Sequence, residues 1–210
     1  ANVEPVISGS PYSKNPAWNV NAGIDSKIGV GDFTMDITIN PDFGQVEADP
    51  SVMNLTALET FYEEKRPFFL EGKHIFDFSA DNNLLFYSRR IGHVPSYAPE
   101  VDNVTSFSKN PEFTNIINAV KMTGTTRNSL SVGILQSTTQ KEKARLTEDG
   151  EETFPVVEPL TNFLVGTIQK TVNKGNTQFG TMFTSTNRFI NDPHLEYLPQ
   201  NAYSAGINLH

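Results

Sequence analysis

The chain has 210 residues, a formal net charge of −8, 37% hydrophobic residues and no cysteine. The missing cysteines exclude a disulfide framework and a cysteine-ligated zinc site, and the acidic balance without a basic stripe argues against nucleic acid as a partner. No apolar run approaches the roughly 20 residues of a membrane helix, whereas a strand of a membrane β-barrel needs only about 9–11 residues.

The clearest pattern is an alternation of apolar and polar residues in the first forty positions. Apolar side chains recur at Ile24 and Ile28 and again from Phe33 to Ile39, and a glycine-containing turn at 29–32 separates the two runs. Two alternating runs joined by such a turn predict a β-hairpin with one apolar and one polar face. Residues 2–9 predict a further strand.

Residues 41–82 do not follow this alternation. Within them, residues 55–64 carry apolar side chains at helical spacing, which predicts one short helix that is capped by Asn54 and ended by Pro67. We expect residues 41–82 to form an irregular insert or plug.

The alternation returns in the second half of the chain. It predicts hairpins over 115–137 and 160–187, a strand at 84–90 and another strand at 202–209. Residues 140–153 are dense in charge and predict an exposed loop. About nine strands that are joined mostly to their neighbours predict an all-β antiparallel meander.

The meander fits either a membrane β-barrel or a soluble β-sandwich, since both bury one face of an alternating sheet. The strand lengths and the alternation of short turns with longer polar loops favour part of an outer-membrane-type barrel. Aromatic residues near strand ends, where interfacial girdles form, favour the same fold: Trp18, Phe33, Tyr87 and Tyr203. We expect residues 1–210 to form a single β domain, the N-terminal part of a larger barrel, because the last predicted strand reaches the final residues.

Acidic side chains gather on the loop that follows the first hairpin. Asp42, Glu47 and Asp49 could supply oxygen ligands to Ca²⁺, although their spacing does not match an EF-hand loop. The carboxylates of residues 40–72 could also form the acid pair of a glycosidase. The four histidines are scattered, and the sequence contains no nucleophile elbow, P-loop or dinucleotide fingerprint. We therefore assign no catalytic residue.

Structural ion pairing explains the charges of this region better than catalysis. Arg66 can fork onto a carboxylate such as Glu47, Asp49 or Glu71, and Arg89 and Arg90 add two further cations. An apolar anchor is predicted next to this arginine, formed by Pro67, Phe68 and Phe69.

Two segments carry a resemblance to a known family. NPDFGQVEADPSVMNLTALETFYEEKRPFFLEG at 40–72, followed by LFYSRRIG at 85–92, resembles a large family of unknown function in envelope proteins of Gram-negative, Bacteroidetes-type bacteria. The resemblance extends through AVKMTGTT, VEPLTNFLVGTIQK and NTQFGTMFTSTNR. In this family the region usually follows a carbohydrate-binding module similar to family 9 and is predicted to form an outer-membrane β-barrel. The resemblance implies a fold and an outer-membrane or envelope location, but no activity.

Together these observations predict an outer-membrane protein that binds or passes a solute, with a glycan as one candidate, or a subunit of a cell-surface assembly. The expected partners are outer-membrane lipid, a glycan or other envelope proteins, with no cofactor other than the candidate Ca²⁺. A soluble carbohydrate-binding β-sandwich and a glycan hydrolase that uses the carboxylates of 40–72 are the alternatives.

Overall fold

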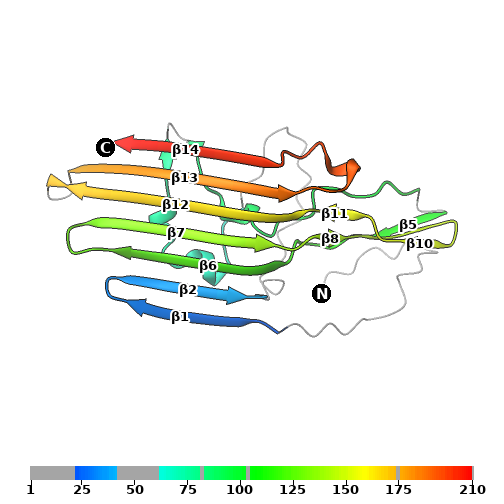
Figure 1. The fold of residues 1–210 in the computed structure, drawn as a ribbon, viewed down its shortest axis with the longest axis horizontal. Coiled ribbons are helices and arrows are strands. Elements are labelled where there is room, and N and C mark those ends of the chain that lie inside the picture. Colours follow the sequence, from blue (N-terminus) through cyan, green and yellow to red (C-terminus); the bar gives the residue numbers. More distant parts are fainter. Residues whose placement is uncertain (1–21, 42–61, 81–82, 103–104, 174–175, 210) are drawn as a thin grey trace.

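A seven-stranded antiparallel sheet forms most of the computed structural model, which describes residues 22–41, 62–80, 83–102, 105–173 and 176–209 (Figure 1). In the order in which they lie side by side, its strands are β1 (Ile24–Val30), β2 (Phe33–Ile39), β6 (Ile116–Thr125), β7 (Leu130–Thr139), β12 (Leu160–Val172), β13 (Thr177–Phe189) and β14 (Asn201–Leu209). The predicted antiparallel meander and its three hairpins are confirmed. Among the described residues, β1 and β14 are the edge strands, so the sheet is open.

The connections differ in length between the two ends of the strands. Short turns join the strands at one end, at residues 31–32, 126–129 and 173–176. Long connections leave the other end, at residues 40–115, 140–159 and 190–200.

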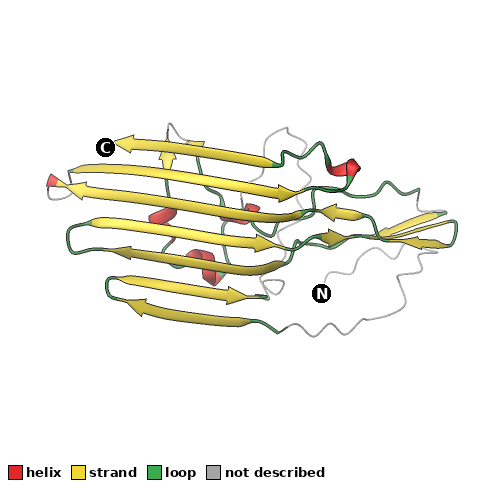
Figure 2. Ribbon diagram, viewed as in Figure 1, coloured by secondary structure: helices red, strands yellow, loops and turns green. Residues whose placement is uncertain are grey.

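Short strands and helices lie within the long connections (Figure 2). The short strands are β3 (Ser79–Ala80), β4 (Asn83–Leu84), β5 (Ser106–Lys109), β8 (Glu142–Lys143), β9 (Arg145–Glu148), β10 (Glu151–Thr153) and β11 (Val156–Glu158). The helical turns are α1 (Pro67–Leu70), α2 (Lys73–Phe76), η1 (Ser88–Arg90) and η3 (Pro193–Leu195). None of the helices in the described ranges is long and apolar enough to cross a membrane.

Residues 140–153 were predicted as a loop, and this prediction was wrong. They contain β8 and the hairpin of β9 and β10, and β9 also pairs with β5. The charged side chains of this hairpin are mostly exposed. Charge density in the sequence therefore reported solvent exposure rather than the absence of regular structure.

The predicted strand at 84–90 is also incorrect. Strand β4 ends at Leu84, and the later residues of this range include the 3₁₀ turn η1. Tyr87 therefore does not lie at a strand end, and its hydroxyl group donates to the backbone oxygen of Tyr62 at 2.9 Å. The apolar run reflects the partial burial of Leu85 and Phe86 against the core, not a strand.

The helix in the irregular region begins where the sequence predicted an end. Pro67 is the first residue of α1, because proline lacks the N–H that a first helical turn leaves unpaired and its fixed φ suits that position. Residues 62–64 are not helical, and the remainder of the predicted 55–64 helix lies outside the described residues. The predicted strand at 2–9 and Trp18 also lie outside them.

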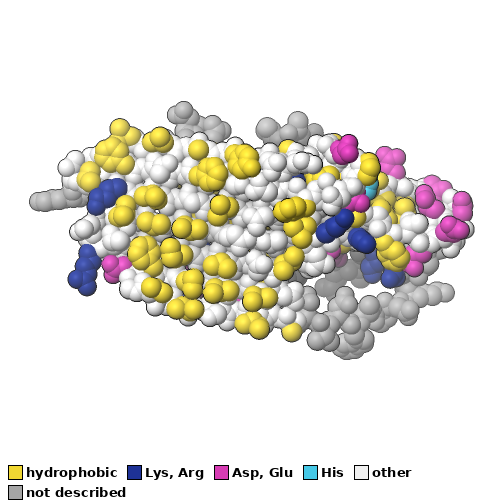
Figure 3. All heavy atoms as spheres, in the orientation of Figure 1, with side chains coloured by type: hydrophobic (Ala, Val, Ile, Leu, Met, Phe, Trp, Pro, Cys, Tyr) yellow, Lys and Arg dark blue, Asp and Glu magenta, His cyan; other side chains and the backbone are white. Residues whose placement is uncertain are grey.

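One face of the sheet is covered by residues 62–80 and 83–91, which we call the covering segment. In Figures 1 and 2 its helical turns lie behind the strands. A hydrophobic core joins the two layers, formed by Phe69, Phe76, Phe78, Ile91, Ile116, Ala119, Leu135, Val165 and Met182. This core holds the covering segment against the strands, so one face of the sheet is buried. The opposite face is the one seen in Figure 3.

A glycine permits the close approach of the two layers. A Cβ atom on Gly133 of β7 would lie 2.8 Å from Ile75 Cγ2 and 3.0 Å from Phe76 Cε1. Since real Cβ atoms do not come within 3.0 Å of other heavy atoms, a larger residue here would push α2 away from the sheet.

Candidate functional site

The outward face of the sheet is apolar and exposed. Antiparallel register places one outward residue from each strand in the row Ile28, Met35, Met122, Ile134, Gly166, Phe183 and Ala205. Ile28, Ile134 and Phe183 are each 42–43% exposed. Hydrophobic side chains spread over the strands in Figure 3, and charged side chains gather near the two ends of this face. An apolar surface of this extent is unusual for a protein face in water.

The inward face carries the buried charged residues of the sheet and several buried hydroxyl groups, beside the apolar core. The row that is one residue along each strand from the row of Ile134 points inward. It consists of Lys27, Asp36, Lys121, Leu135, Val165, Thr184 and Ser204. Lys121 is only 1% exposed, and Thr38, Ser137, Thr161 and Thr167 are buried on the same face. The sheet therefore buries its more polar face, together with the apolar core, and exposes its more apolar face.

Lys121 joins the sheet to the covering segment. Its ammonium group donates to the backbone oxygens of Phe68 and Glu71, the latter at 2.8 Å, and it lies 3.1 Å from Asp36 Oδ2. The ammonium group also lies 4.7 Å from the centre of the Phe68 ring. A buried lysine is tolerated only when its donors are satisfied, and here two of the acceptors belong to the covering segment.

A second, exposed ion pair lies beside Lys121. Lys27 on the edge strand β1 donates to the carboxylate of Glu71, which ends α1. This hydrogen bond lowers the pKa of Glu71. Because both side chains are more than half exposed, solvent screens their attraction.

Arg66 and Glu64 form a buried ion pair within the covering segment. Arg66 Nε and Nη2 donate to the two carboxylate oxygens of Glu64 at 2.8 and 2.7 Å. Nη1 donates to the backbone oxygen of Ile91 at 2.6 Å, and Nη2 also donates to that of Ser88 at 2.9 Å. The guanidinium carbon lies 4.2 Å from the centre of the Phe69 ring. This fork ties the start of α1 to η1 and the residue after it.

Glu64 is held in its ionised form by these neighbours. Burial alone would raise its pKa, but the hydrogen bonds and charge of Arg66, with the hydroxyl group of Ser88 at 2.5 Å, outweigh burial and lower the pKa. A carboxylate that is bound on both oxygens and has a lowered pKa is a poor general acid. The pair therefore acts as a structural clamp.

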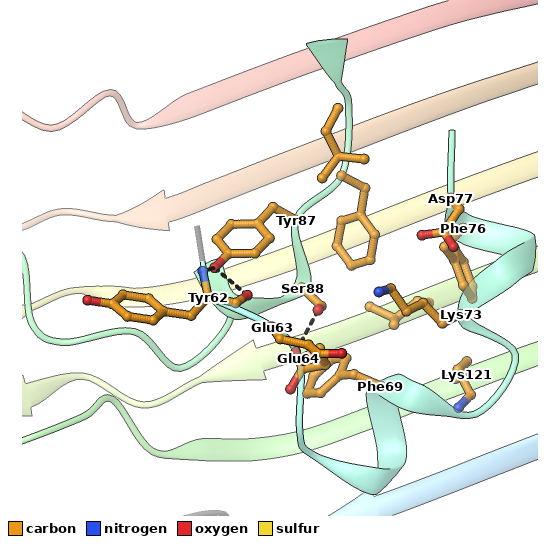
Figure 4. A pocket seen from close by; sticks show the side chains of 13 residues that line it. Tyr62, Glu63, Glu64, Phe69, Lys73, Phe76, Asp77, Tyr87, Ser88 and Lys121 are labelled. Atoms are coloured by element: carbon orange, nitrogen blue, oxygen red, sulfur yellow. Dashed lines mark hydrogen bonds between the residues drawn. The ribbon is translucent and has the colours of Figure 1, made fainter. Parts of the chain in front are cut away.

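A cavity of about 380 Å³ lies between the covering segment and the sheet (Figure 4). Tyr62 and Tyr87 lie on one side of it, and Phe76 of α2 and the following Asp77 lie on the other. The Tyr62 backbone N–H donates to the Tyr87 hydroxyl at 2.7 Å, which closes the first side. The volume falls at the lower end of the range of small-molecule sites, and the walls combine aromatic and charged side chains.

The residues predicted from the sequence fall into three groups. Asp42, Glu47 and Asp49 lie outside the described residues. Arg66 forks onto Glu64, whereas Glu71 binds Lys27. The remaining five lie in α1 and η1: Pro67, Phe68, Phe69, Arg89 and Arg90. Across the described ranges, no three acidic or histidine side chains gather as a metal site.

Sequence reasoning did not assign Glu64 as the partner of Arg66, and it missed Ser88, Lys121 and Asp36. A signal was available for three of them. Glu64 and Arg66 are two residues apart in an extended chain, so their side chains point to the same side. Asp36 and Lys121 occupy the polar positions of alternating strands, which places both charges on one face. Nothing in the sequence indicated that Ser88 would lie beside Glu64.

The fold and site define an open antiparallel meander that covers its polar face with its own insert and exposes its apolar face. A family model described as a domain of unknown function, DUF5916, matches residues 3–191. The chain therefore belongs to this family. Neither a curated protein nor a solved structure matches the chain.

Proposed function

We propose that the chain forms part of an outer-membrane-type β-barrel. In this proposal the outward face contacts lipid hydrocarbon, and the inward face lines the lumen. The observation that carries it is the inverted polarity of the sheet. Exposed Ile134 and Phe183 lie on one face and buried Lys121 on the other, and a membrane barrel needs this arrangement because its exterior is apolar and its interior polar.

Two further features support this proposal. Strands β6, β7 and β14 have 10, 10 and 9 residues, close to the length of a tilted strand that crosses a bilayer. Short turns at one end and long connections at the other are the arrangement of outer-membrane barrels, in which the long loops face the outside of the cell.

The covering segment acts as a plug in this proposal. Lys121 and the aromatic core fix it to the barrel wall, and the Glu64–Arg66 clamp keeps it folded. The cavity beside it binds a small polar solute on its way through, or holds a group of a larger partner in a cell-surface assembly. A glycan is a candidate because of the resemblance to envelope proteins that carry a carbohydrate-binding module. The expected location is the outer membrane.

The test is the behaviour of the full-length protein during extraction. We expect it to partition with the detergent phase and to migrate faster on a gel when unheated than after boiling, as folded barrels do. A protein that stays in the aqueous phase as a monomer without detergent would contradict the proposal and favour a soluble β-sandwich.

A further inference from the structure

One end of the apolar face carries a line of uncharged polar side chains, which we call the amide belt. Its members share one register across five adjacent strands: Asn118, Thr138, Asn162, Asn187 and Asn201. The belt lies at the end of the strands from which the long connections leave.

The side chains of the belt bind one another along the sheet. Asn162 Nδ2 donates to Thr138 Oγ1 at 3.1 Å, and Asn187 Nδ2 donates to Asn201 Oδ1 at 2.8 Å. The Asn187 amide also donates to the hydroxyl of Tyr203 at 3.1 Å. The belt is therefore an ordered surface that remains partly exposed.

The outward rows become more apolar with distance from the amide belt. Val120, Gln136, Leu164, Ser185 and Tyr203 form the row beside the belt, and the row of Ile134 and Phe183 follows. Tyr203 lies at the boundary, with its hydroxyl on the belt and its exposed ring close to the ring of Phe183. Tyrosine takes this orientation where hydrocarbon meets lipid headgroups.

Among the described outward residues of β12, charged side chains occur only beyond the apolar rows. Counting from Asn162, the first charged outward residue on β12 is Lys170, eight positions along the strand. Its ammonium group donates to the backbone oxygen of Asn128, in the short turn between β6 and β7. A lysine that reaches from the apolar band toward the nearer polar end behaves as an interfacial anchor.

We propose that the amide belt contacts the headgroup and ester layer of the bilayer leaflet on the side of the long connections. This inference rests on the proposed membrane location and adds the depth at which the sheet lies. The six residue-to-residue steps from Asn162 to Ile168, at about 3.3 Å each and tilted by about 40°, span roughly 15 Å of depth. That places Ile168 near the centre of an apolar band about 25 Å thick.

The experiment measures depth with spin labels on single cysteines, for which this chain offers a cysteine-free background. Asn162→Cys, Leu164→Cys and Ile168→Cys sample three outward positions of β12 in the full-length protein, reconstituted into phosphatidylcholine vesicles. We expect collisions with lipid-soluble oxygen to rise from 162 to 168, and collisions with a water-soluble nickel reagent to fall several-fold. The label at 162 should keep strong nickel access.

The Asn162→Cys substitution removes a hydrogen bond of the belt, so the measurement is repeated on a second strand. Asn187→Cys and Phe183→Cys on β13 should reproduce the contrast between 162 and the deeper positions. The inference is overturned if Asn162 and Asn187 are as shielded from nickel as Ile168, or if Leu164 is as accessible to nickel as Asn162. Free nickel access at Ile168 itself would instead overturn the membrane location, so the two failures are distinguishable.

Discussion

The two faces of the sheet reverse the usual rule for burial. The inward face buries Lys121, Asp36 and Thr38, whereas the outward face exposes Ile134 and Phe183. In water this arrangement is costly, because each large apolar side chain left exposed forgoes about 1.5–3 kcal/mol of burial. The difference indicates that the two faces are adapted to two different environments, and the following variants test each face separately.

The largest effect is expected for Lys121→Met on the inward face. The substitution leaves Asp36 without its close partner and removes the donor from two backbone oxygens, so we expect a loss of about 3–5 kcal/mol in the free energy of unfolding. Urea unfolding of the reconstituted protein measures it. The double variant with Asp36→Leu should recover much of the loss, and a single variant as stable as the wild type would contradict the account of this contact.

Glu64→Gln tests the clamp that holds the covering segment. At neutral pH we expect a loss of about 3–5 kcal/mol, because Gln cannot neutralise the buried Arg66. The pKa of Glu64 is lowered from its ordinary value of 4.5, so its stabilising contribution is fully present above pH 4.5 and is lost as the pH falls toward the lower folded pKa. The stability difference between wild type and variant should therefore be constant near pH 7 and shrink below pH 4.5.

Unfolding measured from pH 7 to pH 3 checks this dependence. Glu63→Gln is the matched control. The side chain of Glu63 is exposed, so the same substitution there should change stability little. A Glu64→Gln deficit that stays constant down to pH 3 would exclude an ionic clamp.

Ile134→Lys tests the outward face. In a bilayer we expect a cost of about 2–4 kcal/mol, because the new charge would lie within the hydrocarbon. Asn162→Lys, on the amide belt, should cost about 0–1 kcal/mol, because the charge would lie at the interface. Comparison of the unfolding free energies in vesicles measures both, and equal small costs would indicate that the outward face lies in water.

Two glycines on neighbouring strands compare the faces with one substitution. Gly133→Ala points inward into Ile75 and Thr167, so we expect a loss of about 1–3 kcal/mol from overpacking. Gly166→Ala points outward, where an added Cβ meets nothing within 4 Å, and it should be neutral or slightly stabilising. Thermal unfolding of the two variants ranks them, and the reverse order would mean that the faces are assigned incorrectly.

The smallest effect is expected for Lys27→Met. Lys27 and Glu71 form a hydrogen-bonded ion pair, but both side chains are exposed and screened by solvent. We expect no measurable change in the urea midpoint. A loss as large as that of Lys121→Met would show that the covering segment is held by its exposed pair instead of its buried one.

The sequence predicted the sheet well and the covering segment poorly, for physical reasons. Period-two alternation is a local signal, so the hairpins at β6–β7 and β12–β13 could be found from neighbouring residues. The covering segment has no such period. Its shape depends on contacts between residues far apart in the sequence, such as those of Phe76 with the sheet and of Glu64 with Ser88, which no local pattern encodes.

The choice of partners was equally hard to predict. Arg66 had several acidic candidates in the sequence, and the fork onto Glu64 depends on how the chain enters α1 at Pro67. Lys121 was visible as a charge on a polar face, but two of its acceptors are backbone oxygens, which every residue carries. The sequence therefore indicated which face of the sheet is polar, but it did not indicate that the covering segment lies on that face.

The most direct test of the proposed lipid-facing sheet compares two adjacent residues of β7 that point to opposite faces. Ser131→Cys points inward and Val132→Cys outward, and each is labelled with bimane in vesicles containing brominated lipid. If the outward face contacts lipid, we expect strong quenching by the brominated chains at 132 and little at 131. Equal quenching at both positions, or quenching of both labels by aqueous iodide alone, would contradict it.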